Sequence, residues 1–341
     1  MAAAPSLPRS TRQVLLTALP TGLPTREDFG VVETPLPAPG PDQVLVRNRA
    51  FLVFASLCSL IGGGDDMPLP ALKPGDALFG PAVGEVLAAP AGSALRPGDL
   101  VRHMYGWREH ALVPSDACTP LGDALPDPAA HLAQGSAAYG ALTRLTGVRP
   151  GDTVFVTSAA GGVGSLAGQI ARLLGAGRVI GSTGSPAKAQ LLVSELGYDA
   201  VVLRGAGSLA AQLAAAAPDG IDVLLDNVAG EQLAAAIGAA RQGARFALIG
   251  TLSGQLAEDR PGGAPVEVDA FQIILRGITL RGYAGSDHPD VAEEWTARFG
   301  EWLRSGAIRF PHTAVAGLDN APQALQDVIA GKHVGTVVVE P

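Results

Sequence analysis

The sequence predicts two domains of different class: a β-rich domain at the N-terminus and an α/β domain built on a doubly wound parallel sheet. Three observations lead to this prediction. At 341 residues, the chain is longer than one ordinary hydrophobic core requires. Short apolar or alternating runs separated by turn residues fill residues 1–124. From residue 131 onward, helical patterns alternate with apolar strands, as in a parallel sheet with helices on both faces.

The β-rich part contains six runs with the length and pattern of strands. They lie at residues 13–19, 29–36, 42–54, 82–89, 99–104 and 108–113. Pro-Gly pairs at 39–40, 74–75 and 97–98 mark turns between them. This spacing predicts a compact, barrel-like β-domain.

The α/β part contains six apolar strands with helical segments between them. The strands are predicted at 153–158, 178–183, 200–205, 222–228, 245–250 and 278–285, and helices at 131–147, 163–176, 185–197 and 230–243. A further helix at 289–306 and a helix with a terminal strand at 320–341 end the chain. We expect this tail to return to the first domain, which gives domain boundaries of 1–124 with 289–341, and 125–288.

Composition and charge argue against several classes of partner. The formal net charge is -8, and no block of Lys and Arg could follow a phosphate backbone, so nucleic acid is not expected. The start has no signal-peptide pattern, and no apolar run reaches the roughly 20 residues of a membrane span. Cys58 and Cys118 stand far apart in sequence and are expected to be unpaired thiols. A cytoplasmic protein is therefore predicted, with no membrane contact.

The stretch "VTSAAGGVGS" at 156–165 resembles a dinucleotide fingerprint, with alanine where the first glycine is usual. A strand followed at once by a glycine-rich turn and a helix directs free backbone N–H groups at a pyrophosphate. Gly161 allows close approach of the phosphates, and Gly164 allows the helix to pack on its strand. The candidate phosphate-binding residues are Ala160, Gly161, Gly162, Val163 and Gly164.

The end of the second predicted strand indicates which dinucleotide is bound. An NAD-selecting site places Asp or Glu there to bind the ribose 2'-hydroxyl, but this position falls near Thr183. Gly184 and Ser185 follow, then Lys188, with Arg204 after the third strand. These cations and the Ser185 hydroxyl predict NADPH, because charge-assisted hydrogen bonds would hold its 2'-phosphate.

The ends of the fourth and fifth predicted strands supply further candidates. Asn227, Gly250 and Thr251 follow these strands. Because ligands of such sheets lie outside the carboxyl ends of the strands, these residues are expected to flank the nicotinamide ribose.

Several ordered segments together resemble the zinc-independent medium-chain dehydrogenase/reductase family, in its prostaglandin reductase and alkenal double-bond reductase branch. They are "SAAGGVGS", "GSTGSPAK", "ELGYDAVV", "DGIDVLLDNVAGE", "YGWREHALV" and "GKHVGTVVV". The resemblance covers nearly the whole chain, and "DNVAGE" is its most specific match. It implies a GroES-like β-domain, a Rossmann domain, NADPH, and a homodimer formed through the last strand of the sheet.

The same resemblance implies further site residues. Tyr283, Ala284 and Gly285 would line the nicotinamide pocket with backbone amides, and His333 replaces an asparagine that relatives use near the cofactor phosphates. Tyr105 is a candidate substrate contact. Ser56, in "FLVFASLCSL", takes the place of a pocket tyrosine, which puts the usual substrate in doubt.

Zinc is not expected, because two separated cysteines and six histidines without paired ligand spacing cannot supply a tetrahedral site. The leading hypothesis is an NADPH-dependent reductase that transfers hydride to the β-carbon of an α,β-unsaturated ketone or aldehyde, a small-molecule substrate. An NADPH:quinone oxidoreductase, a carbonyl reductase, and a non-reductive NADPH-binding protein such as a cyclase remain as alternatives.

Overall fold

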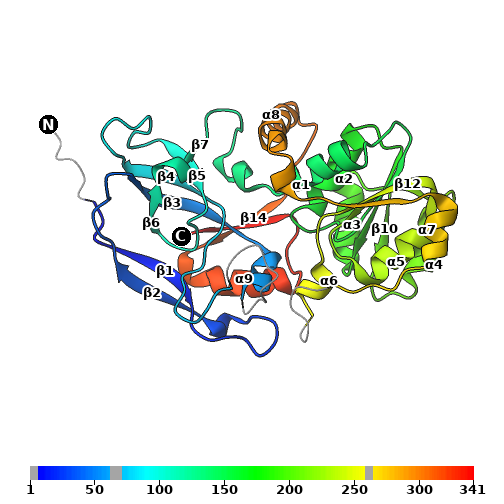
Figure 1. The fold of residues 1–341 in the computed structure, drawn as a ribbon, viewed down its shortest axis with the longest axis horizontal. Helices are drawn as coiled ribbons and strands as arrows, with labels where there is room; N and C mark the ends of the chain where they lie inside the picture. The colour runs from blue at the N-terminus through cyan, green and yellow to red at the C-terminus, as the bar shows by residue number, and fades with distance from the viewer. Residues whose placement is uncertain (1–6, 62–70, 258–263) are drawn as a thin grey trace. The chain divides into compact units, whose positions relative to one another are not determined.

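The computed structural model describes residues 7–61, 71–257 and 264–341. The chain forms two compact units (Figure 1). Unit 1 comprises Met1–Leu132, Thr313–Ala330 and Val337–Pro341, and unit 2 comprises Ala133–His312 and Gly331–Thr336. The predicted fold class is confirmed: one unit is built on antiparallel sheets and the other on a parallel sheet.

Unit 1 is built on a main antiparallel sheet and a separate two-stranded sheet. The main sheet has the order β14-β15-β3-β4-β5-β7, with β6 beside β3, while β1 pairs with β2. The strands are β1 (Ser10–Leu16), β2 (Phe29–Pro35), β3 (Gln43–Val53), β4 (Ala82–Ala88), β5 (Leu100–His103), β6 (His110–Pro114), β7 (Thr119–Pro120), β14 (His312–Ala316) and β15 (Thr336–Glu340). Val337 in β15 pairs with Val53 in β3, so the end of the chain joins the N-terminal sheet as predicted.

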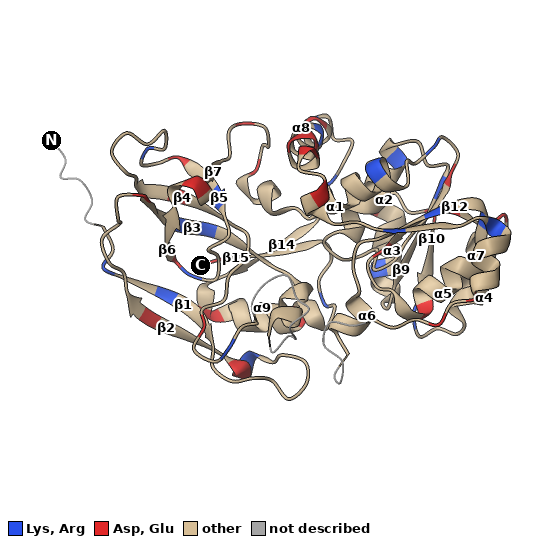
Figure 2. Ribbon diagram, viewed as in Figure 1, with Lys and Arg blue, Asp and Glu red and all other residues tan. Residues whose placement is uncertain are grey.

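The core of unit 1 is apolar and includes segments distant in sequence. Phe51, Leu57 and Trp107 pack with Leu325 of α9 (Ala321–Ile329) and with Val339. Short 3-10 helices connect the strands: η1 (Arg26–Asp28), η2 (Ala55–Leu60), η3 (Ser115–Ala117), η4 (Pro128–Leu132) and η7 (Leu318–Asn320). Charges of opposite sign meet on neighbouring strands, as Figure 2 shows for β3 and β4. There the guanidinium groups of Arg47 and Arg49 both bind the Glu85 carboxylate.

Unit 2 holds a six-stranded parallel sheet in the order β10-β9-β8-β11-β12-β13. The strands are β8 (Thr153–Val156), β9 (Arg178–Thr183), β10 (Ala200–Leu203), β11 (Ile221–Asp226), β12 (Ala240–Leu248) and β13 (Thr279–Gly282). The strand order reverses between β8 and β11. In doubly wound sheets, ligands bind outside the carboxyl ends of the strands at this reversal.

Helices cover the parallel sheet of unit 2. They are α1 (Gly135–Gly140), continued by the π-helix η5 (Ala141–Leu145), α2 (Gly164–Leu173), α3 (Pro186–Glu195), α4 (Leu209–Ala216), α5 (Gly230–Gly238), α6 (Leu252–Gln255), α7 (Ala270–Arg276), the 3-10 helix η6 (Gly285–Asp287) and α8 (Asp290–Ser305). Small residues let α2 lie close to its neighbours: a Cβ on Gly168 would stand 2.4 Å from the Tyr198 ring. No helix within the described ranges is long and apolar enough to cross a membrane.

The boundaries of the two units differ from the expected ones. Residues 289–312 lie in unit 2, not with the N-terminal domain, and the first boundary falls after Leu132 instead of after residue 124. The reason for the first difference is the apolar face of α8, which packs on α1. The rings of Tyr139 and Trp295 lie 5.9 Å apart, and Arg144 binds Asp290 with a distance of 2.9 Å. Sequence pattern identified the helix but could not show which domain its buried face meets.

Candidate cofactor site

The glycine-rich turn between β8 and α2 offers unpartnered backbone donors. The N–H groups of Gly162, Val163 and Gly164 have no hydrogen-bond partner among the described residues. The turn is closed by the Gly161 N–H, which donates to the Ser158 carbonyl at 3.0 Å. Unpaired amides at the start of a helix form an anion site, and the helix dipole strengthens it. This arrangement can hold a diphosphate, as the sequence predicts.

Close approach of neighbouring atoms restricts the glycines of this turn, most strongly Gly164, which faces backbone. A Cβ on Gly164 would stand 2.2 Å from the Ser158 carbonyl oxygen, and a Cβ on Gly162 would stand 1.9 Å from Gln134 Oε1. Both distances are far below van der Waals contact, so any larger residue would displace the backbone or Gln134. Ala159, in contrast, stands at the first fingerprint position and is fully buried with its methyl group accommodated, so that position needs no glycine here.

Residues 331–336 lie along the same turn and add unpaired side-chain donors. The Gly335 N–H donates to the Ala160 carbonyl at 2.9 Å. Thr336 is 1% exposed, and its Oγ1 has no partner in the described ranges; His333 Nε2 is also buried and unpaired there. A buried polar atom without a partner is costly, so these two atoms indicate a ligand that would complete their hydrogen bonds. His333 was expected from the sequence, whereas Thr336 was not.

The carboxyl end of β9 carries the polar residues that the sequence predicts, and no carboxylate stands among them. Thr183, Gly184 and Ser185 lead into α3, and the Ser185 hydroxyl caps that helix by accepting from the Lys188 N–H at 3.4 Å. The Arg204 guanidinium lies over Gly184: a Cβ there would stand 3.0 Å from Arg204 Nη2. Arg204 is exposed, so its charge is available to a ligand at this strand end.

Lys188 lies in the first turn of α3, and its ammonium group makes contacts that the sequence did not indicate. Its Nζ donates to the backbone carbonyls of Gly331 and His333, which ties α3 to residues 331–336. Burial lowers the pKa of the Lys188 ammonium. An ammonium has three N–H donors, so one remains for a ligand. Lys188 therefore both positions the 331–336 segment and retains capacity for a phosphate.

A buried carboxylate organises the carboxyl ends of β8 and β11. Asp226 is fully buried; it accepts from Thr157 Oγ1 at 2.6 Å and from the N–H groups of Val228 and Ala229. Burial raises the pKa of the Asp226 carboxyl, although these hydrogen bonds oppose the rise. Asp226 was not predicted as a site residue, even though it stands in "DNVAGE"; its position at a strand end was the available signal.

The same network fixes Asn227, which the sequence placed near the ribose. Its Nδ2 donates to the Thr157 carbonyl at 2.7 Å, and its backbone N–H donates to Thr157 Oγ1 at 2.7 Å. Gly250 approaches closely, since a Cβ there would stand 2.9 Å from the Asn227 carbonyl oxygen. Thr251 follows and begins α6. The structure thus brings Asn227, Gly250 and Thr251 to one edge of the sheet.

The three residues that follow β13 lie at the carboxyl end of the last strand of the same sheet. Tyr283 is half-buried, and its N–H donates to the Leu248 carbonyl at 2.9 Å, extending the pairing of β12 and β13 by one residue. Burial raises the pKa of the Tyr283 phenol. Ala284 and Gly285 follow and are exposed.

The two candidate catalytic residues lie in unit 1. Tyr105 follows β5 and is half-buried; its N–H donates to His103 Nδ1 at 3.0 Å, and its carbonyl accepts from Asn48 Nδ2 at 3.0 Å. Ser56 lies exposed in η2, directly before the buried residues Leu57–Leu60 that anchor this short helix. Each residue is held by its own local structure. The hydroxyl groups of Tyr105 and Ser56 have no partner within the described part of the chain.

Two family descriptions match the chain. Residues 162–301 match "Zinc-binding dehydrogenase", and residues 12–121 match "N-terminal domain of oxidoreductase". Within the described ranges, no group of three or more His, Cys, Asp or Glu residues could hold a metal ion. Cys58 and Cys118 are buried, and burial raises the pKa of their thiols to about 12 and about 11. This donor set does not fit zinc, which binds thiolates and neutral imidazoles.

Whole-chain comparisons agree with these matches. The chain is 30% identical to the NADPH-dependent curcumin reductase of Escherichia coli (strain K12), over 96% of each chain. It is 30% identical to prostaglandin reductase 1 of Mus musculus, over 94% of this chain and 95% of that protein. The structure of CurA in complex with NADPH, from Vibrio vulnificus, is similar with a TM-score of 0.88 and 28% identity, over 96% of this chain and 98% of that chain. The chain therefore belongs to the medium-chain dehydrogenase/reductase family of oxidoreductases, in the branch of the prostaglandin and alkenal double-bond reductases.

Proposed function

We propose that this protein is an NADPH-dependent reductase that acts on the carbon–carbon double bond of an α,β-unsaturated ketone or aldehyde. Bound NADPH supplies the hydride that adds to the β-carbon, a proton from solvent goes to the α-carbon, and the saturated carbonyl compound leaves with NADP+. The chain's own task is to hold cofactor and acceptor together, to exclude water and to stabilise negative charge on the carbonyl oxygen.

One observation supports this proposal most strongly. Among the described residues, three amides at the start of α2 have no hydrogen-bond partner, and the buried Thr336 Oγ1, which lies next to Gly162, also has none. His333 Nε2, in the same 331–336 segment, is likewise buried and unpaired. All five belong to unit 2, and each lacks only a hydrogen-bond partner. A pyrophosphate would accept from all of them. The family relatives that use NADPH support the same cofactor.

The selection of NADPH over NADH is assigned to the end of β9. Arg204 would bind the 2'-phosphate there, with the Ser185 hydroxyl and the remaining Lys188 N–H. Because Lys188 also holds residues 331–336, its loss should weaken both cofactors, whereas the loss of Arg204 should act on the 2'-phosphate alone.

Binding of NADPH and NADH to Arg204→Ala tests this assignment. A charge-assisted hydrogen bond contributes about 1.5 to 3 kcal/mol, so the Kd for NADPH should rise at least tenfold, while that for NADH should change by less than about twofold. Arg298→Ala, on α8, is the matched control because the one ion pair of Arg298 among the described residues is with Glu301 on its own helix. Equal weakening of both cofactors by Arg204→Ala would contradict the assignment.

The acceptor class is tested by product analysis with purified protein. NADPH oxidation, followed by its near-ultraviolet absorbance, should be rapid with a conjugated enone and slow with a simple ketone, and the product should be the saturated ketone. Faster turnover of a quinone would support the alternative of a quinone oxidoreductase. NADPH binding without turnover of any acceptor would overturn the reductase proposal and favour a non-reductive role.

Tyr105 and Ser56 are proposed as the residues that contact the substrate. Their hydroxyl groups have no partner among the residues that the structure describes, and either could donate to the developing enolate oxygen. If Tyr105 has this role, Tyr105→Phe should lower kcat and leave NADPH affinity unchanged, while Ser56→Ala should act mainly on KM.

A homodimer is also proposed, through the edge of the unit 2 sheet. β13 is the last strand of that sheet, and all four of its residues are exposed. Helix α7 beside it exposes Phe271 by 61% and Ile274 by 74%. An open strand edge with exposed apolar side chains is typical of an interface. Ile274→Asp should convert a dimer to a monomer in sedimentation analysis; a monomeric wild type would contradict this proposal.

The two free, buried cysteines are consistent with a cytoplasmic location, which we also propose.

A further inference from the structure

The side chain of Gln169, on α2, is almost fully buried and uses both ends of its amide for hydrogen bonds. It is 7% exposed. Its Oε1 accepts from the Arg309 N–H at 2.8 Å, and its Nε2 donates to the carbonyls of Arg309 at 3.0 Å and Ser165 at 2.8 Å. The amide thus pairs with Arg309 in both directions, as a residue of a neighbouring strand would. It ties this part of the chain to the first turn of α2, the helix whose start offers the unpartnered amides.

Residues 309–311 in turn hold the segment that carries Thr336. The Pro311 carbonyl accepts from the Thr336 N–H at 3.0 Å. Gly335 lies so close that a Cβ there would stand 1.9 Å from the same carbonyl oxygen, and its φ is +77°. On its other side, the Gly335 N–H donates to the Ala160 carbonyl at 2.9 Å. Gly335 and Thr336 therefore connect residues 309–311 to the glycine-rich turn, and all of these residues belong to unit 2.

The Thr336 hydroxyl is the point at which these contacts reach the proposed ligand site. Its Oγ1 is buried without a partner in the described part of the chain, and it lies 3.5 Å from the position that a Cβ on Gly162 would take. Hydrogen bonds weaken steeply outside a narrow range of distance and angle. Because the hydroxyl moves with its own backbone, its bond to a phosphate depends on how firmly Pro311 holds residue 336.

Two other contacts keep these segments in place when Gln169 is changed. Lys188 binds the start of residues 331–336 through the carbonyls of Gly331 and His333. The Phe310 ring packs edge-on against Phe299 of α8, with centroids 6.0 Å apart. Loss of the Gln169 amide should therefore loosen the Thr336 end of the segment without unfolding unit 2.

We propose that Gln169 is a positioning residue for the cofactor: through Arg309 and Pro311 it sets Thr336 Oγ1 for a hydrogen bond to the diphosphate. Gln169 itself does not touch the cofactor. This inference rests on the proposed function, because it assigns a role within the same cofactor site. The sequence placed Gln169 in a predicted helix and gave it no role, since its partners lie about 140 residues away.

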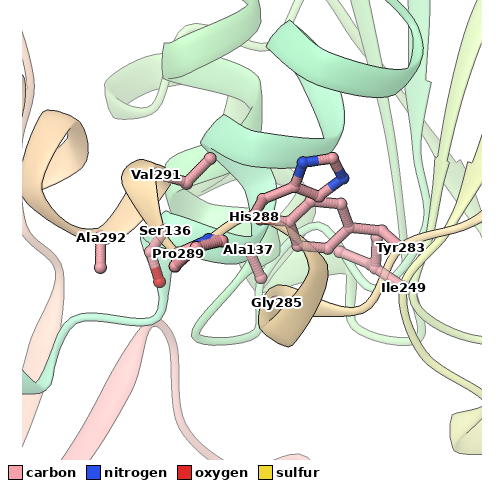
Figure 3. Close-up of a pocket in the computed structure, with 9 residues that line it drawn as sticks. All are labelled: Ser136, Ala137, Ile249, Tyr283, Gly285, His288, Pro289, Val291 and Ala292. Carbon is pink, nitrogen blue, oxygen red and sulfur yellow. The ribbon is translucent and has the colours of Figure 1, made fainter.

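The cavity of unit 2 lies outside this set of contacts and provides an internal reference. Figure 3 shows this cavity, of about 260 Å³, with the Tyr283 and His288 rings stacked at an interplanar angle of 4°. Its lining comes from α1, from the segments after β12 and β13 and from the start of α8, not from residues 309–311 or 331–336. The two rings should therefore keep their environment when Gln169 is replaced.

Amide hydrogen exchange in the cofactor-free protein tests the first step of the proposal. Gln169→Met keeps the length of the side chain and removes its hydrogen bonds, so the Gly335 and Thr336 amides should exchange at least about tenfold faster. The NMR signals of the His288 ring should stay at their wild-type positions, which shows that unit 2 remains folded. Unchanged exchange at both amides would overturn the proposal.

Cofactor binding tests the second step in a double-mutant cycle. Thr336→Val removes one hydrogen bond to a charged group, so the Kd values for NADP+ and NAD+ should each rise about tenfold. Gln169→Met alone should raise both about fivefold, but less than about twofold in the Thr336→Val background. Adenosine 2'-monophosphate has no diphosphate, and its Kd should stay within about twofold of the wild-type value in every variant.

Gln212→Met is the matched control, because Gln212 on α4 pairs with a backbone residue in the same way. Its Oε1 accepts from the Leu203 N–H at 2.8 Å, and its Nε2 donates to the Leu203 carbonyl at 3.0 Å. These bonds lie at the end of β10 and do not reach Thr336. Gln212→Met should leave the Kd for NAD+ and the exchange rate of the Thr336 amide within about twofold of the wild type. Equal effects of Gln212→Met and Gln169→Met would overturn the proposal.

The possible results separate this inference from the proposed function. If Gln169→Met raises the Kd values by the same factor with and without the Thr336 hydroxyl, Gln169 does not act through Thr336 and the inference fails. Reduction of an enone by the wild type would still support the reductase proposal. If the wild type binds NADP+ but reduces no acceptor, the reductase proposal fails. An effect of Gln169→Met that disappears in the Thr336→Val background would then still support the positioning role.

Discussion

The two units hold their strained backbone residues in different ways. In unit 1, Trp107 has a φ of +62° and is fully buried, with its ring 5.2 Å from that of Phe51. In unit 2, Ser158 and Ala229 have φ values of +51° and +65° and lie in the turns after β8 and β11. Residues with side chains rarely adopt positive φ, so each conformation must be compensated by its surroundings.

The compensation differs in its chemistry. Trp107 is held by the packing of a large ring in an apolar core. Ala229, with ψ of −150°, is held by its N–H, which donates to both carboxylate oxygens of Asp226 at 3.1 Å. Strain in the core is thus offset by dispersion and burial, whereas strain at the proposed ligand edge is offset by hydrogen bonds to a buried carboxylate. The two regions should respond to different perturbations.

The largest effect is expected when the packed ring of unit 1 is removed. Trp107→Ala should lower the free energy of unfolding by about 3 to 5 kcal/mol, because it leaves a cavity in a core that cannot close around it. Denaturant unfolding measures this loss. Trp302→Ala, at a half-buried tryptophan on α8, should cost less than half as much. Similar losses in both variants would show that packing at Trp107 is not what holds its backbone.

Acid should destabilise unit 1 through His103. Burial lowers the pKa of the His103 imidazole from 6.5 to about 4, and its Nδ1 accepts from the Tyr105 N–H. The unfolded chain therefore takes up this proton first, and stability is lost as pH falls from 6.5 towards 4. The loss assigned to His103 is about 3 kcal/mol. In His103→Asn, whose side-chain oxygen can replace the acceptor, the unfolding free energy should fall less over this range; an unchanged pH profile would contradict the prediction.

Loss of the Asp226 carboxylate should release the turn after β11. Asp226→Asn replaces an acceptor oxygen with a donor that faces the Ala229 N–H, and should cost about 2 kcal/mol of unfolding free energy. A double-mutant cycle sharpens the test. In an Ala229→Gly background the same substitution should cost less, because glycine needs no hydrogen bonds to hold a positive φ. Additive effects would indicate that the carboxylate does not hold this conformation.

The smallest effect should be a gain. Ala229→Gly removes strain of about 1 to 3 kcal/mol and loses about 0.4 to 1 kcal/mol through a more flexible unfolded chain. A net stabilisation of about 1 kcal/mol is therefore expected, visible as a higher Tm. Ala234→Gly, inside α5, is the matched control and should instead destabilise by about 0.5 to 1 kcal/mol. A lower Tm for Ala229→Gly would show that the positive φ of Ala229 carries no strain that glycine relieves.

Much of unit 2 could be predicted because its signals are local. The six strands, the turn at 156–165 and the absence of a carboxylate near Thr183 are each visible in a few consecutive residues. Two kinds of feature were missed. Asp226 and Thr336 carry no motif of their own, and their roles depend on neighbours about 70 and 170 residues away in sequence. The contacts of Lys188 with the backbone carbonyls of Gly331 and His333 were also missed, because these residues are remote in sequence.

The sequence by itself determined the fold class, the family and the cofactor turn, because periodicity, glycine spacing and strand ends are properties of short segments. Only the tertiary structure decided that α8 belongs to unit 2, that Asp226 holds Ala229, and that Tyr283 and His288 stack beside a cavity. The physical reason is that burial, hydrogen-bond partners and ring contacts depend on distances between residues that are remote along the chain. Those distances exist only once the chain has folded.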